Sequence, residues 1–445
     1  TNGFVLTGEE SGDRSGYSVA SAGDVNGDGI DDILIGAWGA DVGRQSDAGK
    51  TYVVFGATSG FGASIDLGAL DGTDGVALTG SSYNGISGIS VSAAGDVNGD
   101  GIDDIVVGAP GVQPGGGAYV VFGSDTNFGA GINLGALDGT DGFTLTGAAA
   151  GDRMGASVSS AGDVNGDGID DLIIGASNTD VDGRSYVGKS YVVFGTSGAR
   201  SATLDLGSLD GSDGFTVTHS SGAWTRSGSA VSSAGDMNGD GIDDLVIVDD
   251  RTSLSGTSPG GLAYVVFGSA QGFAATVDLN KLDASSGFVI GNDRGTADLG
   301  QSVASAGDVN GDGIDDLLIS ASTASPDGIS RAGETFLIFG TGDGYNGVVD
   351  VADLDGKDGF IFKGGDAVGY SGSSVSSAGD VNGDGISDIL IGAYGGTISS
   401  GIAAGESYLI YGGAASLAEF DAADGMSDGQ IALSYLGLDP FELYA

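Results

Sequence analysis

The 445-residue chain has no cysteine, only five prolines and a single histidine, His219. Without cysteine it can form neither a disulfide framework nor a thiolate metal site. The few prolines exclude a collagen-like or proline-rich chain, and no apolar run reaches the ~18 residues of a membrane-spanning helix. Glutamate is also scarce, since only six of the 61 acidic residues are Glu. Because long helices favour Glu, Lys, Leu and Ala, this composition argues against a helical architecture.

Glycine and aspartate are abundant instead, with 90 Gly and 55 Asp. Both residues favour turns, and Asp is a preferred oxygen ligand in metal loops. The 14 basic residues leave a formal net charge of −47, which disfavours nucleic acid and anionic membranes as partners and favours cations. A hydrophobic fraction of 40% excludes wholesale disorder. Composition therefore predicts a folded β-protein with many Asp/Gly turns.

An internal repeat sets the architecture. The string DVNGDGIDD begins at Asp24, Asp96, Asp163 and Asp308, and close variants begin at Asp236 and Asp380. Successive copies are 72, 67, 73, 72 and 72 residues apart, so the chain contains six repeats. Such a fixed period is the sequence signature of a repeat architecture rather than of separate domains.

Each repeat contains four short β-like segments separated by turns. In the third repeat these are a small-residue segment at 157–162, apolar runs at 171–176 and 191–195, and a final run at 214–218. Four antiparallel strands repeated radially form a β-propeller blade. We therefore predict an all-β fold, a propeller of six four-stranded blades. The N-terminal segment 3–8 matches a fourth strand, so we expect it to join the last blade and close the ring.

The repeated nine-residue motif carries the strongest chemical signal. Oxygen-bearing side chains stand at positions one, three, five and nine, glycine stands at position six, and position seven can offer its backbone carbonyl. Calcium takes six to eight oxygen ligands, and acid-rich loops with a tight turn supply them. We therefore expect about six Ca²⁺ ions, with a structural role between the first two strands of each blade. The predicted ligands are Asp24, Asn26, Asp28, Ile30, Asp32, Asp96, Asn98, Asp100, Ile102, Asp104, Asp163, Asn165, Asp167, Ile169, Asp171, Asp236, Asn238, Asp240, Ile242, Asp244, Asp308, Asn310, Asp312, Ile314, Asp316, Asp380, Asn382, Asp384, Ile386 and Asp388.

In these motifs the chain resembles the FG-GAP repeat of integrin α-subunit β-propellers and their bacterial relatives, over about residues 3–412. The first part of the family pattern is present, for example, as Gly155-Ala156-Ser157-Val158, and the Gly-Ala-Pro part as Gly108-Ala109-Pro110. The resemblance implies a calcium-binding propeller. Integrin propellers have seven blades of shorter period, so seven blades stays the alternative to six. The segment 413–445 is predicted to be a tail or linker, or to form an extra strand.

The loops at the blade ends opposite the calcium motifs, here called the loop face, are predicted to bind a partner. They are segments 8–16, 37–50, 80–88, 109–118, 147–155, 176–190, 219–228, 249–262, 291–300, 320–334, 364–372 and 393–406. These segments hold eight of the nine arginines and both tryptophans, and Arg and aromatic residues are enriched at binding hot spots. Local pairing with neighbouring acids is the other interpretation. The candidate ligand-binding residues are Arg14, Trp38, Arg44, Arg153, Arg184, Trp224, Arg226, Arg251, Arg294 and Arg331.

Three functions remain open at this point. The leading hypothesis is a secreted or cell-surface adhesion module that binds a glycan or a surface protein. The alternatives are a structural spacer and a polysaccharide lyase or hydrolase, although no triad partner for His219 can be matched by spacing, so we expect no enzyme. The chain begins at Thr1 without Met or a signal segment, so we expect part of a larger protein. The lack of cysteine and the near-identical repeats favour a bacterial source.

Overall fold

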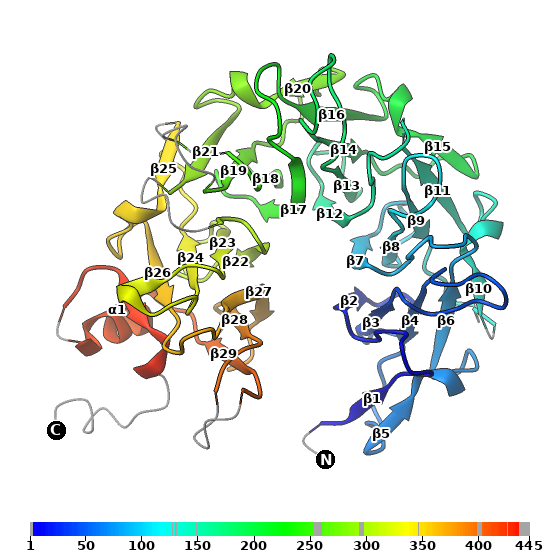
Figure 1. Ribbon diagram of the computed structural model, residues 1–445, viewed down its shortest axis with the longest axis horizontal. Helices are drawn as coiled ribbons and strands as arrows, with labels where there is room; N and C mark the ends of the chain where they lie inside the picture. The colour runs from blue at the N-terminus through cyan, green and yellow to red at the C-terminus, as the bar shows by residue number, and fades with distance from the viewer. Residues whose placement is uncertain are drawn as a thin grey trace. The chain divides into compact units, whose positions relative to one another are not determined.

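Each sequence repeat supplies one antiparallel sheet, a blade, in the computed structural model of the chain (Figure 1). The structure describes residues 3–435 except 127, 130, 148, 253, 255–259, 293–297, 346, 398–402 and 425. It divides into two compact units, Thr1–Val231 with Gln271–Asp278, and Ser232–Ala270 with Leu279–Ala445. The described residues form six blades, three for each unit.

The first unit contains blades one to three and a separate two-stranded sheet. Blade one is β2 (Ser18–Gly23), β3 (Asp32–Ala37), β4 (Lys50–Val54), β6 (Gly75–Thr79) and β10 (Ile132–Asn133). Blade two is β7 (Ser90–Gly95), β8 (Asp104–Gly108), β9 (Gly117–Val121), β11 (Gly142–Thr146) and β15 (Thr203–Asp205). Blade three is β12 (Ser157–Gly162), β13 (Asp171–Ala176), β14 (Lys189–Val193), β16 (Gly214–Thr218) and β20 (Thr276–Asp278). The two-stranded sheet pairs β1 (Val5–Thr7) with β5 (Ser64–Asp66) in parallel.

The second unit contains blades four to six. Blade four is β17 (Ser227–Gly235), β18 (Asp244–Asp249), β19 (Leu262–Val266), β21 (Gly287–Gly291) and β25 (Val348–Asp350). Blade five is β22 (Val303–Gly307), β23 (Asp316–Ala321), β24 (Glu334–Ile338), β26 (Gly359–Lys363) and β30 (Gln430–Ala432). Blade six is β27 (Ser371–Gly379), β28 (Asp388–Ala393) and β29 (Glu406–Ile410). With three described strands, blade six leaves Leu390 and Leu409 each 41% exposed.

The outermost strand of a blade comes from the following repeat. In blade one, β2, β3, β4 and β6 pair antiparallel, and β10 of the second repeat then pairs parallel to β6, with Ile132 opposite Leu78. The same parallel pairing joins β16 to β20 and β21 to β25. The sequence predicted four strands per blade and missed this fifth one, because it is only two or three residues long.

One-turn 3₁₀ helices follow these outer strands and fix the turn into the next strand. They are η1 (Leu67–Ala69), η2 (Leu134–Ala136), η3 (Leu206–Ser208), η4 (Leu279–Lys281), η6 (Val351–Asp353) and η8 (Leu433–Tyr435). A capping side chain such as Asp66 accepts a hydrogen bond from the backbone N–H of Gly68, and the first residue of the helix, such as Leu67, is buried. Another one-turn helix, η5 (Pro326–Gly328), lies in a loop-face segment.

The C-terminal segment adds the fifth strand of blade five. After α1 (Ala414–Asp421) and η7 (Ala422–Asp424), β30 pairs parallel to β26, with Ile431 opposite Phe362. Leu417, Ile431 and Leu433 are buried in the same apolar cluster as Phe360 and Phe362. The segment therefore repeats the arrangement of strand and one-turn helix found in the other repeats.

The structure confirms the all-β, six-bladed β-propeller and the positions of the predicted strands. The alternative of seven blades is not supported, because the described residues form six. The N-terminal β1 has the parallel outer partner of a fourth strand, since Leu6 lies opposite Ile65 as Leu78 lies opposite Ile132. Closure of the ring by this strand stays a prediction.

Candidate calcium loops and the opposite loop face

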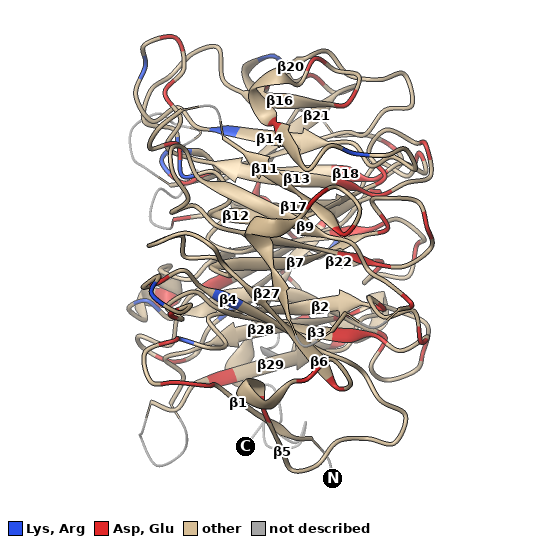
Figure 2. Cartoon of the chain, turned by 90° about the vertical axis from the view of Figure 1, so that its right-hand side faces the viewer, with Lys and Arg blue, Asp and Glu red and all other residues tan. Residues whose placement is uncertain are grey.

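The nine-residue motifs form the hairpins between the first and second strands of the blades. The first strand ends in a β-bulge, marked by a register shift between Ser21 and Gly23, and the motif then runs from Asp24 to Asp32, the first residue of β3. Figure 2 shows acidic residues at this end of β3 and a basic residue at the opposite end of the neighbouring β4. The bulge turns the chain sharply at the place where the loop must begin.

Side-chain oxygens of the motif organise the loop from within. In the first loop the two carboxylate oxygens of Asp24 accept the backbone N–H groups of Asp28 at 3.0 Å and Gly29 at 2.7 Å. The Asn26 side chain also accepts from the Asp28 N–H, and the Asp28 side chain accepts from the Ile30 N–H. The equivalent bonds recur in the second loop, where Asp96 accepts from residues 100 and 101. The side chains at positions one, three and five thus accept hydrogen bonds from the backbone of their own loop, and their role as calcium ligands stays a prediction.

The ninth position is buried at the base of the hairpin. The carboxylate of Asp32, 1% exposed, accepts the backbone N–H groups of Val25 at 3.1 Å and Gly56 at 2.7 Å. Burial, together with the neighbouring carboxylates Asp28 and Asp24, raises the pKa of Asp32 to about 6. The same causes raise the pKa of Asp104, Asp171 and Asp244 to about 8 and that of Asp316 to about 7. An ionised carboxylate at this position is therefore destabilised unless a positive charge lies near it.

The donor set of each loop fits a hard cation by its chemistry. It combines three carboxylates, one amide oxygen and one backbone carbonyl, an all-oxygen set that is typical of calcium, whereas zinc sites usually contain His or Cys. The Ile30 side chain packs against the main chain of Gly56, so its carbonyl is the only oxygen that position seven can offer. Among the described residues, however, no three His, Cys, Asp or Glu side chains are already gathered around one point. Calcium binding by these loops therefore stays a prediction.

Two predicted arginines of the first unit contact an aromatic ring or backbone carbonyls. The guanidinium of Arg14 lies 4.0 Å from the ring centre of Trp38, whose other neighbour is Tyr17, 63% exposed. Arg184 donates to the carbonyls of His219 and Gly222 and so braces the segment 219–228.

Trp224 presents an exposed ring supported from one side. It stacks on Tyr186 with 4.7 Å between ring centres and is 58% exposed. Arg44 and Arg153 lie in segments 37–50 and 147–155 as predicted, both on the surface. The first unit therefore brings together Arg14 with Trp38 and, separately, Arg184 and Trp224.

In the loop-face segments of the second unit the described aromatic residues are tyrosines. Tyr370 and Tyr394 stack with ring centres 4.9 Å apart, and Arg331 donates to the Tyr370 hydroxyl at 3.2 Å. Arg251 lies 4.0 Å from the carboxylate of Asp250. The predicted residue Arg294 lies outside the described residues. The prediction for this face rested on its arginines and tryptophans and did not foresee the stacking of these tyrosines.

The loop face has an unusual backbone. Thirteen described residues other than glycine have a positive φ, and all of them lie in the loop-face segments. They are Arg14, Asp47, Asn84, Ile86, Arg153, Asp182, Tyr186, Trp224, Arg226, Asp327, Arg331, Val368 and Tyr370. In the calcium loops the positive φ angles belong to glycines such as Gly27 and Gly29. A left-handed backbone conformation costs ~1–2 kcal/mol for most L-residues. The loop face therefore keeps residues with side chains at positions where glycine would make the fold more stable.

The same pattern of backbone hydrogen bonds, here called the frame, holds several of these left-handed residues. In the frame, two N–H groups of one loop-face segment donate to two carbonyls of a neighbouring segment. The N–H of Trp224 donates to the carbonyl of Ser185, and the N–H of Arg226 donates to that of Tyr186. Asn84 and Ile86 make the equivalent bonds to residues 46 and 47, and Val368 and Tyr370 to residues 330 and 331. The frame is thus constant, while the displayed side chains change from one blade connection to the next.

Comparison with known proteins agrees with this geometry. The FG-GAP repeat matches residues 15–54, 87–121, 154–193 and 371–410, which lie in blades one, two, three and six. The chain contains FG-GAP repeats. The FG-GAP matches span the first three strands of each of these blades, calcium motif included, and leave out blades four and five.

Three relatives illustrate the similarity. Integrin alpha-5 of Xenopus laevis is 32% identical over 186 residues, 40% of this chain and 16% of that protein. Phosphatidylinositol-glycan-specific phospholipase D of Bos taurus is 34% identical over 187 residues, which are 41% of this chain and 20% of that protein. Integrin alpha pat-2 of Caenorhabditis briggsae is 28% identical over 278 residues, which are 60% of this chain and 21% of that protein. The matched parts therefore make up about a fifth or less of each relative.

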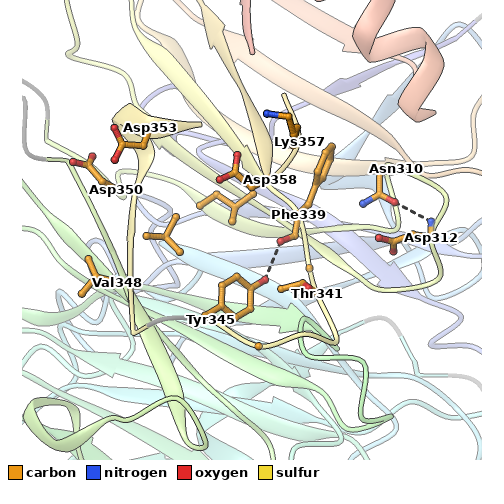
Figure 3. A pocket seen from close by; sticks show the side chains of 14 residues that line it. Asn310, Asp312, Phe339, Thr341, Tyr345, Val348, Asp350, Asp353, Lys357 and Asp358 are labelled. Carbon is orange, nitrogen blue, oxygen red and sulfur yellow. Dashed lines mark hydrogen bonds between the residues drawn. The ribbon is translucent and has the colours of Figure 1, made fainter. Parts of the chain in front are cut away.

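A cavity of about 550 Å³ lies beside the fifth calcium loop (Figure 3). It is lined by Asn310 and Asp312 of that loop and by Tyr345, whose ring stacks on Phe288 with 3.7 Å between centres. The Tyr345 hydroxyl donates to the carbonyl of Phe339 at 2.9 Å. Four aspartates and one lysine line the cavity, so its charge disfavours an anionic ligand.

No described helix is long and apolar enough to cross a membrane.

Proposed function

We propose that this chain is a calcium-stabilised binding module, secreted or displayed at a cell surface, that holds its ligand with the loop face. The observation that carries the proposal is the confinement of all thirteen described left-handed non-glycine residues to that face. Strained backbone of this kind concentrates at binding and active sites, because elsewhere glycine would replace it at a lower cost.

The side chains retained at those positions are suited to recognition. They include Arg14, Arg226 and Arg331, and the aromatic residues Tyr186 and Trp224. Arginine pairs bidentately with carboxylate, sulfate or phosphate groups, and an exposed ring offers a flat apolar surface. The loop-face segments hold 10 of the 14 basic residues and 16 of the 61 acidic ones, so they are far less negative than the rest of the chain. Their arginines offer local sites for an acidic group, and we propose an acidic glycan first.

Calcium would support this role without taking part in ligand contact. Each of the six loops has a buried carboxylate at the start of the second strand and more exposed carboxylates before it, and a bound Ca²⁺ would neutralise them and tie the first two strands together. We expect no catalytic activity from the chain. The relatives include both integrins and a phospholipase D, and the matched fraction of each is too small to transfer the activity of the whole protein.

The test uses the full chain on an array of neutral, carboxylated and sulfated glycans, with calcium and with EDTA. Replacing Trp224 by glycine removes the ring and relieves the backbone at φ 63°, so we expect binding to weaken at least about tenfold without loss of stability. Asn84→Gly is the matched control, because Asn84 occupies the same position of the frame.

Two results would overturn the proposal. No binding of any glycan or surface protein in calcium would favour a spacer. Release of reducing ends from an acidic polysaccharide would favour an enzyme.

A further inference from the structure

The eighth residue of the calcium motif contacts the preceding blade, a role that sequence reasoning missed. Its carboxylate accepts the backbone N–H of the first motif residue one blade earlier. The three pairs seen within a single unit are Asp103 with Asp24 at 2.8 Å, Asp170 with Asp96 at 2.9 Å and Asp315 with Asp236 at 3.1 Å. The partners in each pair are 74 to 79 residues apart in sequence.

A second hydrogen bond runs in the opposite direction at two of these contacts. The backbone N–H of Asp170 donates to the carbonyl of Asp96 at 3.3 Å, and that of Asp315 to the carbonyl of Asp236 at 3.2 Å. The residue that begins one calcium loop is therefore held at both its N–H and its carbonyl by the eighth residue of the next loop. A carboxylate acceptor makes the first of these bonds charge-assisted.

The glycine before the motif leaves space for this contact. A Cβ atom added to Gly23 would lie 2.2 Å from the Asp103 carboxylate, and one added to Gly235 would lie 2.4 Å from that of Asp315. Both glycines also have a positive φ, of 71° and 73°. At these two glycines the Ala-Gly-Asp start of the motif is thus explained by the neighbouring blade as well as by its own loop.

The geometry points to the eighth-position carboxylates Asp103, Asp170 and Asp315 as positioning residues that hold the first calcium ligand of the preceding blade. This inference rests on the calcium binding of the proposed function. The carboxylates of Asp24, Asp96 and Asp236 accept N–H groups inside their own loops, so fixing their backbone fixes the direction of their side chains. Calcium affinity of one loop then depends on the next blade, because groups that hold a ligand in place contribute to metal affinity.

Blade six offers a natural contrast. Its eighth motif residue is Ser387, whose backbone N–H donates to the carbonyl of Asp308 at 3.1 Å. The backbone half of the contact is present there, but a serine has no carboxylate to receive the Asp308 N–H. The second unit therefore contains one contact with a carboxylate bond, at Asp236, and one with the backbone bond and no carboxylate, at Asp308.

Hydrogen exchange on the full-length protein, first without calcium, tests the contact itself. Asp315→Ser should speed exchange of the peptide that contains the Asp236 amide by roughly tenfold, the expected effect of losing a charge-assisted hydrogen bond. Ser387→Asp should slow exchange of the peptide that contains the Asp308 amide. The second variant adds a bond, so it tests the inference even if the first one fails to fold.

Calcium titration of the same peptides then tests the positioning role. Asp315→Ser should weaken the apparent calcium affinity of loop 236–244 by about tenfold, whereas Ser387→Asp should tighten loop 308–316. Asp343→Ser is the control, because it removes one exposed negative charge near these loops and should change neither peptide.

The possible failures are distinguishable. Unchanged exchange at Asp236 in Asp315→Ser disproves the contact whether or not calcium binds. Faster exchange with unchanged calcium affinity leaves a structural bond and overturns the positioning role. If calcium protects no loop of the wild-type protein, the calcium part of the proposed function fails, whereas the calcium-free exchange still reports on the contact.

Discussion

The two ends of the blades meet the same backbone requirement in different ways. At the calcium loops, left-handed positions are occupied by glycines such as Gly27, Gly29 and Gly235, so the turn is made at little cost. On the loop face the same φ region is occupied by glycines such as Gly88 and Gly155 and also by thirteen other described residues, among them arginine, tryptophan, tyrosine and valine. The difference between the two ends is therefore that, among the described residues, only the loop face keeps side chains at left-handed positions.

Calcium removal should produce the largest effect and should act on the glycine-rich end alone. Since a ligand that binds only the folded state stabilises it, EDTA should lower the thermal midpoint on the order of 10 °C. Differential scanning calorimetry of the wild type and of Trp224→Gly should give the same decrease, because the loop face lies at the other end. Equal melting curves with and without calcium would contradict the loop assignment.

Glycine replacement at the calcium end should come next. Gly235→Ala introduces both a left-handed alanine and a Cβ atom 2.4 Å from the Asp315 carboxylate, so we expect a loss of about 3 kcal/mol in unfolding free energy. Gly29→Ala is the matched control, since Gly29 has φ 85° but open space around its Cβ position, and should cost about 1 kcal/mol. Urea unfolding measures both, and equal losses would remove the clash from the explanation.

The reverse replacement on the loop face should stabilise the protein. Val368 is a β-branched residue with φ 62° and is 48% exposed, so Val368→Gly should raise the unfolding free energy by about 1 kcal/mol. Urea unfolding at fixed calcium concentration measures the change. A clear loss of stability would mean that the Val368 side chain contributes packing and not display.

The smallest effect should come from an ion pair that anchors a loop-face segment. Lys50 at the start of β4 donates to the Glu9 carboxylate, and this lowers the pKa of Glu9 below its usual value. A lowered pKa stabilises the fold above the unfolded-state pKa, and this contribution is lost as pH falls through the folded-state value. Glu9→Gln should therefore cost about 0.5 kcal/mol at pH 7, and the difference from wild type should be smaller at a pH low enough to protonate Glu9 in the folded protein. An equal difference at both pH values would exclude the ion pair as its cause.

The repeat period made most of the fold predictable. Apolar runs such as 171–176 identified the long strands, and the motif spacing identified the hairpins between them. The outer strands escaped prediction because β10 and its equivalents span two or three residues and pair with the preceding repeat. The sequence of a segment of two or three residues does not show which strand of another repeat it pairs with.

The two parts of the candidate site were predictable to different degrees. The motif singled out Asp24, Asn26 and Asp28, because their oxygens recur at alternate positions, and the side chains of Asp24 and Asn26 accept hydrogen bonds within the loop. The eighth position was overlooked, since its partner lies in another blade. On the loop face, residue type indicated Arg14 and Trp224, but neither the stacking of Trp224 on Tyr186 nor the left-handed backbone could be read from residues that normally avoid it.

The donation of an outer strand by each following repeat separates the segment that was copied in evolution from the segment that folds. A 72-residue copy that starts at one motif carries the last strand of its predecessor and lacks the last strand of its own sheet. Excision or insertion of a single copy would thus leave both neighbours able to pair, because every copy brings what the one before it needs. Gain and loss of whole copies is the route by which such a gene can change length without passing through an unfolded product.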